Sequence, residues 1–372
     1  MTGRWRLLSA VALTAALAAC SGPDKPKPTP LESLTPTLKG KQIWTQRIGD
    51  VKFPLSVATA GNRIALATSG GDVFALDPAD GHELWRADVG SKIAAGVGSD
   101  GRYASVVTTE NELVVLDSGK PLWRKRLGGR VVTAPLVAGE RVFVLGVDRA
   151  VQAFDVLDGR LLWVQRRQGD PLTLMQPGVL IAWRDTLVVG HGARLVGLDP
   201  LQGTIRWETA VAAPRGANEV ERLADLVGPA ARVDESVCAR AFQSAVGCVN
   251  AERGVLSWTK NVGGVDGLSA DTQYVFGADS TDRITAWKRS NGEVAWTSER
   301  FLYRGLSAPI VVGRSVVFGD EEGYMHFLDR DSGQPLLRVQ PDGKPIAAAP
   351  VRLGAMLVAV TRGGTIYAFQ PE

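Results

Sequence analysis

The stretch Asp72-Val-Phe-Ala-Leu-Asp-Pro-Ala-Asp-Gly-His-Glu-Leu-Trp85 combines a β-branched and apolar strand, a turn built on Asp and Gly, and a second strand that ends on Trp. The unit returns as Val151-Gln-Ala-Phe-Asp-Val-Leu-Asp-Gly-Arg-Leu-Leu-Trp163 and as Ile284-Thr-Ala-Trp-Lys-Arg-Ser-Asn-Gly-Glu-Val-Ala-Trp296. Further copies end at Trp123, Trp207, Trp258 and, with Leu in place of Trp, at Leu337. Self-similarity at such a period predicts a repeat architecture.

The spacing of these units predicts how many there are and how they close. From Trp44 to Leu337 the successive spacings are 41, 38, 40, 44, 51, 38 and 41 residues, the length of a four-stranded propeller blade. The last unit, 365–372, stops before its Trp strand, whereas 42–48 has the Trp-strand pattern with no strands before it. We therefore expect an all-β, eight-bladed β-propeller of four-stranded antiparallel blades, closed by the N-terminal strand joining the C-terminal blade.

The Trp and His residues have structural explanations. Seven of the ten Trp residues occupy the same place in the repeat, so we expect them to pack blade against blade rather than to stack on a ligand. The three His residues, His82, His191 and His326, fall in different units without metal-ligand spacing. No metal site is expected.

The first forty residues are organised differently. Arg4 and Arg6 precede an apolar run, which is too short to span a bilayer, and Leu17-Ala-Ala-Cys20 follows. A plain secretory signal would fit, but this tetrapeptide is a lipobox, which favours a lipoprotein signal peptide over 1–19 and lipidation of Cys20. Residues 20–41 carry five prolines and predict a tether that reaches up to roughly 60 Å from the lipid. The propeller is then expected over 42–372.

Charge excludes one class of partner. The chain has 42 basic and 39 acidic residues, and removal of Arg4 and Arg6 with the signal leaves 40 against 39, a net charge of +1. Nucleic-acid binders usually carry a basic excess, so no nucleic-acid partner is expected.

Cys238 and Cys248 are the two cysteines beyond Cys20, and they flank an expected hairpin turn near Gln243. They could face each other on adjacent strands as a disulfide, which an oxidising compartment permits. They could equally be two small buried apolar residues. The sequence leaves both interpretations open.

One connection between units is longer than the others. The link from Trp207 to Pro229 has 22 residues, where five others have 10 to 14, and such links all emerge on one face of a propeller. The long link and its predecessor are therefore neighbours. Two interpretations remain: an apolar centre with a charged rim for a protein partner, or leucines tucked under their own loop with solvated charges. The residues concerned are Leu172, Leu174, Met175, Glu219, Glu221, Arg222 and Asp225.

These features together resemble the BamB family of lipoproteins in the outer-membrane β-barrel assembly machinery, through the lipobox, the proline-rich tether, eight units of the quinoprotein-like (PQQ-type) repeat and Asn218-Glu-Val-Glu-Arg-Leu-Ala-Asp225. The resemblance implies a non-enzymatic scaffold without cofactors. Its partners would be the POTRA domains of a BamA-like barrel subunit, other lipoproteins of the complex and unfolded outer-membrane proteins.

The resemblance also implies a location and contact residues. Because Ser21 follows the cysteine, the family's sorting rule implies lipid anchoring at the periplasmic face of the outer membrane. Leu172, Leu174 and Asp225 match the family's contacts to the barrel subunit. Met175 stands where the family has Arg, and Val227 where a second acid is expected.

Two rival functions share the repeat. A pyrroloquinoline-quinone dehydrogenase would need, by family resemblance, a calcium-binding carboxylate set and commonly adjacent cysteines, whereas the acids here mostly occupy repeated turn positions that Asp favours through local hydrogen bonds. A generic propeller adaptor of the cell envelope differs from a BamB-like scaffold only in the two loops. Fold alone does not decide function.

Overall fold

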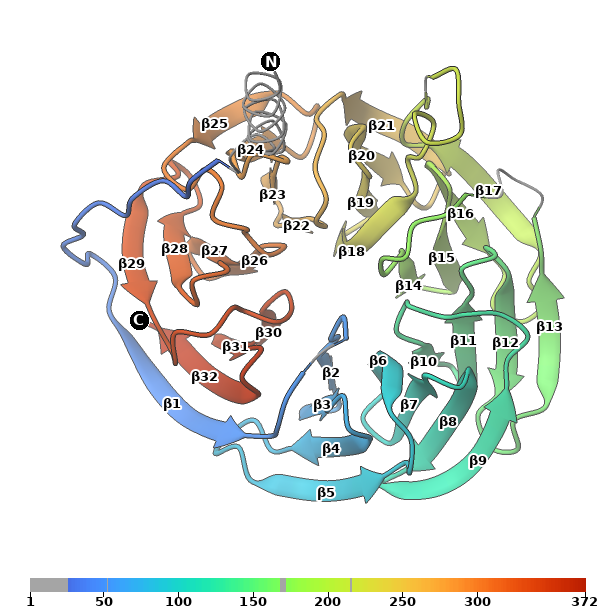
Figure 1. Cartoon of the computed structure of the whole chain (residues 1–372). Coiled ribbons are helices and arrows are strands. Elements are labelled where there is room, and N and C mark those ends of the chain that lie inside the picture. The colour runs from blue at the N-terminus through green and yellow to red at the C-terminus, as the bar shows by residue number, and fades with distance from the viewer. Residues whose placement is uncertain (1–25, 52, 168–171, 215) are drawn as a thin grey trace, which may run out of the picture.

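Four-stranded antiparallel meanders make up the protein, as seen in a computed structural model that describes residues 26–51, 53–167, 172–214 and 216–372. The expected signal peptide (1–19) and Cys20 lie outside the described residues. Within the described ranges the strands form eight sheets of four, arranged as a ring around a central axis (Figure 1). The sequence-based prediction of an eight-bladed propeller is confirmed. No helix in the described part of the chain is long and apolar enough to cross a membrane.

In chain order the blades run as follows. Blades one to four consist of β2 (Ala58–Ala60), β3 (Arg63–Ala67), β4 (Asp72–Leu76) and β5 (Glu83–Asp88); β6 (Ile93–Ser99), β7 (Tyr103–Thr108), β8 (Glu112–Asp117) and β9 (Lys120–Arg126); β10 (Leu136–Ala138), β11 (Arg141–Leu145), β12 (Val151–Asp155) and β13 (Leu161–Gln165); and β14 (Leu180–Trp183), β15 (Thr186–His191), β16 (Arg194–Leu198) and β17 (Ile205–Ala210).

Blades five to eight consist of β18 (Leu226–Val233), β19 (Ser236–Ala241), β20 (Ala245–Asn250) and β21 (Val255–Lys260); β22 (Ser269–Ala270), β23 (Tyr274–Ala278), β24 (Ile284–Lys288) and β25 (Val294–Ser298); β26 (Ile310–Val312), β27 (Ser315–Gly319), β28 (Met325–Asp329) and β29 (Pro335–Val339); and β30 (Val351–Leu353), β31 (Met356–Val360), β32 (Thr365–Pro371) and β1 (Gly40–Arg47).

The core lies in the middle strands of each blade. Every residue of β7, β19 and β27 is buried, whereas the outer strand β9 is exposed at six of its seven positions. Middle strands are covered by neighbouring blades on both faces, and this explains why their sequences are nearly continuous apolar runs rather than alternating ones. The outer strands carry the polar residues.

A repeated contact between Trp and Gly joins neighbouring blades. The indole Nε1 of Trp44 donates to the carbonyl of Pro78 at 2.7 Å, and Trp163 does the same to Pro200 at 3.1 Å. A Cβ on Gly203, in the same turn as Pro200, would lie 2.5 Å from a ring carbon of Trp163. The Gly-containing turns predicted from the sequence thus pack against the Trp side chains of the preceding blade.

The ring closes through β1. This strand pairs with β32 antiparallel, from Gly40 opposite Pro371 to Arg47 opposite Thr365, and so supplies the fourth strand of blade eight, as expected. It begins at Gly40, two residues before the expected start of the propeller. Part of the expected tether also lies against the propeller, since the amides of Thr37 and Leu38 both donate to the carbonyl of Leu336.

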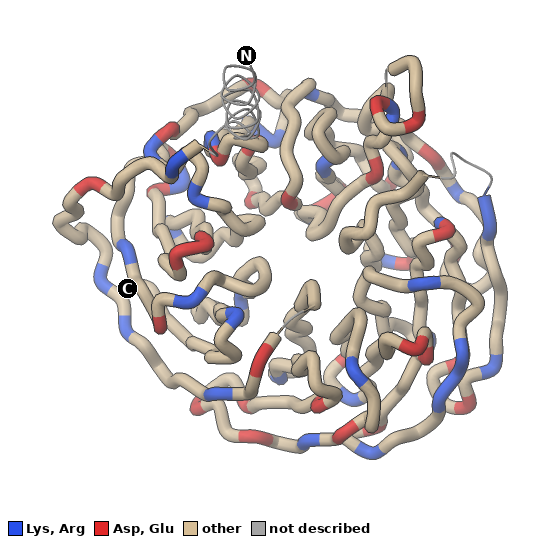
Figure 2. The backbone as a smooth tube through the Cα atoms, viewed as in Figure 1, with Lys and Arg blue, Asp and Glu red and all other residues tan. Residues whose placement is uncertain are grey.

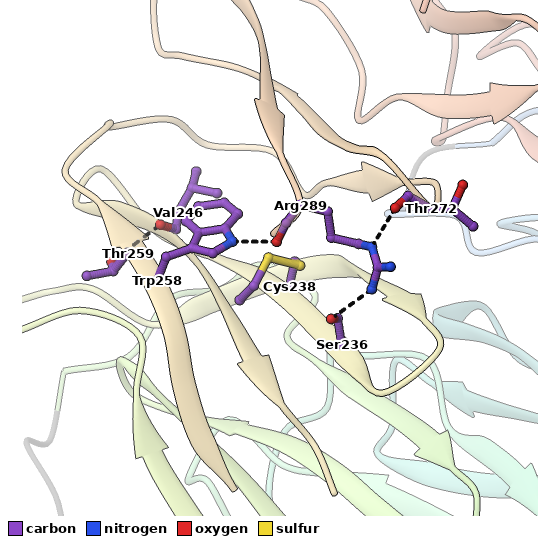
Figure 3. The surroundings of a disulfide bond; sticks show 8 residues. Ser236, Cys238, Val246, Trp258, Thr259, Thr272 and Arg289 are labelled. Atoms are coloured by element: carbon purple, nitrogen blue, oxygen red, sulfur yellow. Dashed lines mark hydrogen bonds between the residues drawn. A yellow bond between two sulfur atoms is a disulfide. The ribbon is translucent and has the colours of Figure 1, made fainter. Parts of the chain in front are cut away.

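The two inner cysteines form a disulfide. Cys238 on β19 and Cys248 on β20 are direct register partners across a hairpin and are joined by a disulfide bond. Figure 3 shows the bond beside Trp258, whose Nε1 donates to the carbonyl of Arg289 at 2.8 Å. Of the two interpretations open from the sequence, the structure therefore has the disulfide, and both cysteines are also buried.

Candidate functional site

The two connections singled out from the sequence lie on one face of the ring. In each blade the links between its first two strands and between its last two strands lie at one end. The link between the middle strands and the connection to the next blade lie at the other. We call the latter the connection face, and it carries the connections 166–179, between β13 and β14, and 211–225, between β17 and β18. Residues 168–171 and 215 lie outside the described ranges.

Asp225 holds the two connections together. Its Oδ2 accepts a hydrogen bond from the amide of Leu174 at 2.9 Å, and its Oδ1 accepts one from Nη2 of Arg149 at 2.8 Å. The same Arg149 nitrogen donates to the carbonyl of Leu172 at 3.2 Å. Both charged side chains are only 16% exposed. The carboxylate therefore shapes the segment from Leu172 to Met175 rather than lying on its rim.

The apolar side chains of this segment differ in exposure. Leu172 and Leu174 are half-buried, so they are neither fully exposed to a partner nor fully tucked under their own loop. Met175 is 47% exposed. Val220, at the tip of the longer connection, is 71% exposed. We define the loop patch as Leu172, Leu174 and Met175. Val220 was not among the residues selected from the sequence, because one Val in a polar loop gives no pattern.

The other charged residues belong to a separate turn. Oε2 of Glu221 accepts the amide of Ala217 at 2.7 Å, and its Oε1 accepts Nδ2 of Asn218 at 3.0 Å. Nη1 of Arg222 donates to the carbonyl of Ala217 at 3.4 Å. Glu221 and Arg222 thus stabilise the tip of their own connection, and the structure does not bring them into contact with Leu172 or Leu174 in any described interaction.

A charge cluster lies at the start of the connection that carries Leu172 and Leu174. Arg167 and Arg194 both pair with Glu208, linking the end of β13 to β16 and β17. Although burial alone would raise the pKa of Glu208, these two arginines hold it below its ordinary value. Burial lowers the pKa of nearby His191 to about 4, and the charges of Arg167 and Arg149 add to this effect. His191 is therefore a neutral imidazole under the site at neutral pH.

The space at the loop patch is small. A shallow hollow of about 40 Å³ lies beside Leu174 and Asp225, with Thr133, Leu145 and Val227 among its walls. Pockets for cofactor-sized ligands usually enclose several hundred Å³, so this hollow admits a few water molecules or the tip of one side chain. Val227, where the resemblance led us to expect a second acid, is buried here.

The described residues do not bring together the acidic side chains that the calcium ion of a quinone enzyme would need. Within the described ranges no group of three or more His, Cys, Asp or Glu side chains could hold a metal ion. His82 contacts Asp80, and His326 contacts Asp320, in blades far apart along the chain. Basic and acidic residues are both distributed around the ring (Figure 2).

Comparison with known proteins places the chain in a family. The family model described as outer membrane protein assembly factor BamB matches residues 33–95 and 69–298. Proteins named outer membrane protein assembly factor BamB are 35% identical in Burkholderia pseudomallei, over 99% of each chain, and 30% identical in Bordetella pertussis, over 97% of this chain and 96% of that protein.

Solved structures agree in fold. The crystal structure of BamB from Moraxella catarrhalis matches with a TM-score of 0.81 and 22% identity, over 89% of this chain and all of that one. A quinohemoprotein alcohol dehydrogenase from Comamonas testosteroni matches with a TM-score of 0.66 and 14% identity, over 89% of this chain and 76% of that one. Since the family model and full-length relatives at 30% identity or more agree, the chain belongs to the BamB family of outer membrane protein assembly factors.

Proposed function

We propose that this protein is a non-catalytic scaffold in the assembly of outer-membrane proteins. It is anchored by lipid on Cys20 at the periplasmic face of the outer membrane. It binds the POTRA domains of a BamA-like barrel subunit, acts with other lipoproteins of the assembly complex and assists unfolded β-barrel proteins. The naming of relatives that match nearly the whole chain supports assembly as the function.

The observation that carries the contact proposal is the arrangement around Asp225. Its carboxylate fixes the amide of Leu174, and the pair with Arg149 fixes the carboxylate, so the apolar segment is held in one shape before a partner arrives. Such preorganisation reduces the entropy lost on binding. Burial of a Leu or Met side chain in an interface contributes about 1.5–3 kcal/mol.

The quinone-dehydrogenase alternative has weaker support. The match to such an enzyme has 14% identity and reflects the shared fold, whereas identity to BamB proteins reaches 35% over the full chain. The donor set for a calcium-quinone site is also not gathered among the described residues. The scaffold function therefore accounts for more of this chain.

Affinity purification from detergent-solubilised envelope tests the proposal. Tagged full-length protein is compared with the Leu172→Ser/Leu174→Ser variant, and circular dichroism checks that both are folded. We expect the wild type to recover a BamA-like barrel subunit and the variant to lose it. Recovery of a different envelope complex by the wild type would support the generic-adaptor alternative and contradict our proposal.

A further inference from the structure

The chain from Thr29 to Lys39 lies along the outside of blade seven, and we call it the N-terminal strap (Figure 1). At its first residue both backbone groups are bonded: the Thr29 amide donates to the carbonyl of Leu302 at 2.9 Å, and its carbonyl accepts Nη1 of Arg304 at 3.1 Å. Arg304 is itself fixed, because its Nη2 lies 2.8 Å from Oδ2 of Asp320 and both side chains are almost fully buried.

The middle of the strap has polar and apolar contacts. The carbonyl of Glu32 accepts Nη1 of Arg338 at 3.1 Å, and its carboxylate pairs with Arg300. Leu31 packs against the apolar cluster that contains Phe301. These contacts come from β29 and from the connection between β25 and β26, so the strap is bound along its length rather than at one point.

The far end of the strap joins the closing strand. The amides of Thr37 and Leu38 donate to the carbonyl of Leu336 at 2.9 and 3.3 Å, and Leu38 is 5% exposed. The amide of Glu372 then donates to the carbonyl of Lys39 at 2.8 Å, next to the start of β1. The strap is thus continuous with the interaction that closes the ring.

The direction of the strap follows from the topology. Leu302 and Arg304 lie in the connection from β25 to β26, which is on the connection face, whereas Leu336 lies near the start of β29, at the opposite face. The strap therefore begins at the connection face and crosses the rim of blade seven before the chain enters β1. The chain therefore enters the strap at the face that carries the loop patch.

We propose that the strap orients the propeller relative to the membrane, with the connection face turned toward the bilayer, and that its release lengthens the tether. This proposal rests on the lipid anchor at Cys20 in the proposed function. Cys20 precedes Thr29 by nine residues and Lys39 by nineteen. At ~3.1 Å per residue for a proline-rich chain, the reach is about 30 Å with the strap bound and about 60 Å without it.

A pair of matched variants separates strap binding from general effects on the surface. Leu31→Asp places a carboxylate in the apolar contact with the cluster around Phe301. Thr35→Asp adds the same charge at an exposed position of the same strap. Hydrogen exchange of the Thr29 and Thr37 amides in the full-length protein reports whether the strap is bound, whatever the state of Cys20.

Fluorescence measures the orientation of the lipidated protein in vesicles. A single added cysteine carries a donor dye, at Asn261→Cys on the connection face or at Ser290→Cys in the turn between β24 and β25 on the opposite face, and both positions are exposed. The acceptor is a headgroup-labelled lipid. Because Cys238 and Cys248 are paired and Cys20 would carry lipid, the added cysteine is the reactive thiol.

In the wild type and in Thr35→Asp, we expect greater energy transfer from position 261 than from position 290. In Leu31→Asp, we expect this difference to be lost, together with the protection of the Thr29 amide. Equal transfer from both positions in the wild type, or an unchanged difference in Leu31→Asp, would overturn the proposal. Protected amides in a chain whose Cys20 carries no lipid by mass spectrometry would instead locate the failure in the anchor of the proposed function. Fast exchange of the Thr29 and Thr37 amides in the wild type would show that the strap is not bound, and would locate the failure in the strap.

Discussion

Arg149 and Asp225 lie 76 positions apart in the sequence, and their side chains meet at 2.8 Å on the connection face. Arg149 comes from the turn between β11 and β12 in blade three, and Asp225 from the last residue before β18 in blade five. The connection that carries Leu174 is bonded to both, through the carbonyl of Leu172 and the amide of Leu174. The shape of the loop patch therefore depends on a contact that spans three blades.

Removal of this carboxylate should loosen the patch. We expect Asp225→Ala to lower the free energy of unfolding by about 1–3 kcal/mol, because the amide of Leu174 loses its acceptor and the guanidinium of Arg149 loses its charged partner. Urea unfolding measures the change, and hydrogen exchange should show faster exchange of the Leu174 amide. The matched control is Glu221→Ala, whose carboxylate bonds within its own turn, and which should leave that amide unchanged.

A double-mutant cycle tests whether the two charges act as a pair. If they do, Arg149→Ala combined with Asp225→Ala should be less destabilising than the sum of the two single changes. Additive effects would show that the contact in the structure contributes little to stability.

Because Trp163 packs closely on Gly203, adding one methyl group at Gly203 should lower the stability of the fold strongly. Gly203 has φ of 72°, and an added Cβ would meet the indole ring at 2.5 Å. We expect Gly203→Ala to lower the free energy of unfolding by about 2–4 kcal/mol, from backbone strain and displacement of the ring. Gly313→Ala is the control, because φ is 56° there but the added Cβ meets no atom within 4 Å. Equal losses in the two variants would contradict the blade-locking role of the Trp side chains.

His191 predicts a pH dependence of stability. Burial lowers its pKa from 6.5 to about 4, so below pH 6.5 the unfolded chain binds a proton that the folded protein takes up only near pH 4. The stability that this group contributes is complete above pH 6.5 and falls by about 3 kcal/mol as the pH drops to 4. His191→Phe should flatten the curve of unfolding free energy against pH in this window. A wild-type slope retained in the variant would contradict this assignment.

The disulfide should stabilise blade five. Cys238 and Cys248 close a loop of ten residues, for which the loss of entropy in the unfolded chain corresponds to about 2–3 kcal/mol. The Cys238→Ala/Cys248→Ala variant should be destabilised by this amount in urea. Addition of a reductant should lower the free energy of unfolding of the wild type to the same extent and leave the variant unaffected.

The repeat explains why the fold could be predicted from the sequence. Each of the seven repeat Trp residues, and Leu337 in the same place, marks one blade. The strand of Trp44 had no partner strands before it, so it fitted one position, beside the strand that ends at Pro371. Local patterns sufficed because a blade contacts mainly its neighbours. The adjacency of the two long connections followed from the same topology.

The contacts of the site could not be predicted in the same way. Arg149 lies in a turn whose residues vary from blade to blade, so nothing in the repeat connects it with Asp225. The strap resembles a free tether in composition because of its prolines, and only its three leucines, Leu31, Leu34 and Leu38, hint that it packs against the propeller. Glu221 was expected beside the leucines because the two connections emerge as neighbours on one face, but its own turn offered nearer donors.

We propose the loop patch as the surface that binds the barrel subunit. The most direct test measures the affinity of the wild type, Met175→Asp and Leu201→Asp for the purified periplasmic POTRA domains of a BamA-like subunit. Leu201 is 61% exposed against 47% for Met175, and it lies in the turn between β16 and β17 on the opposite face, so it is a matched control. We predict binding about tenfold weaker or more for Met175→Asp and unchanged for Leu201→Asp. Equal affinity of Met175→Asp and the wild type would contradict the claim.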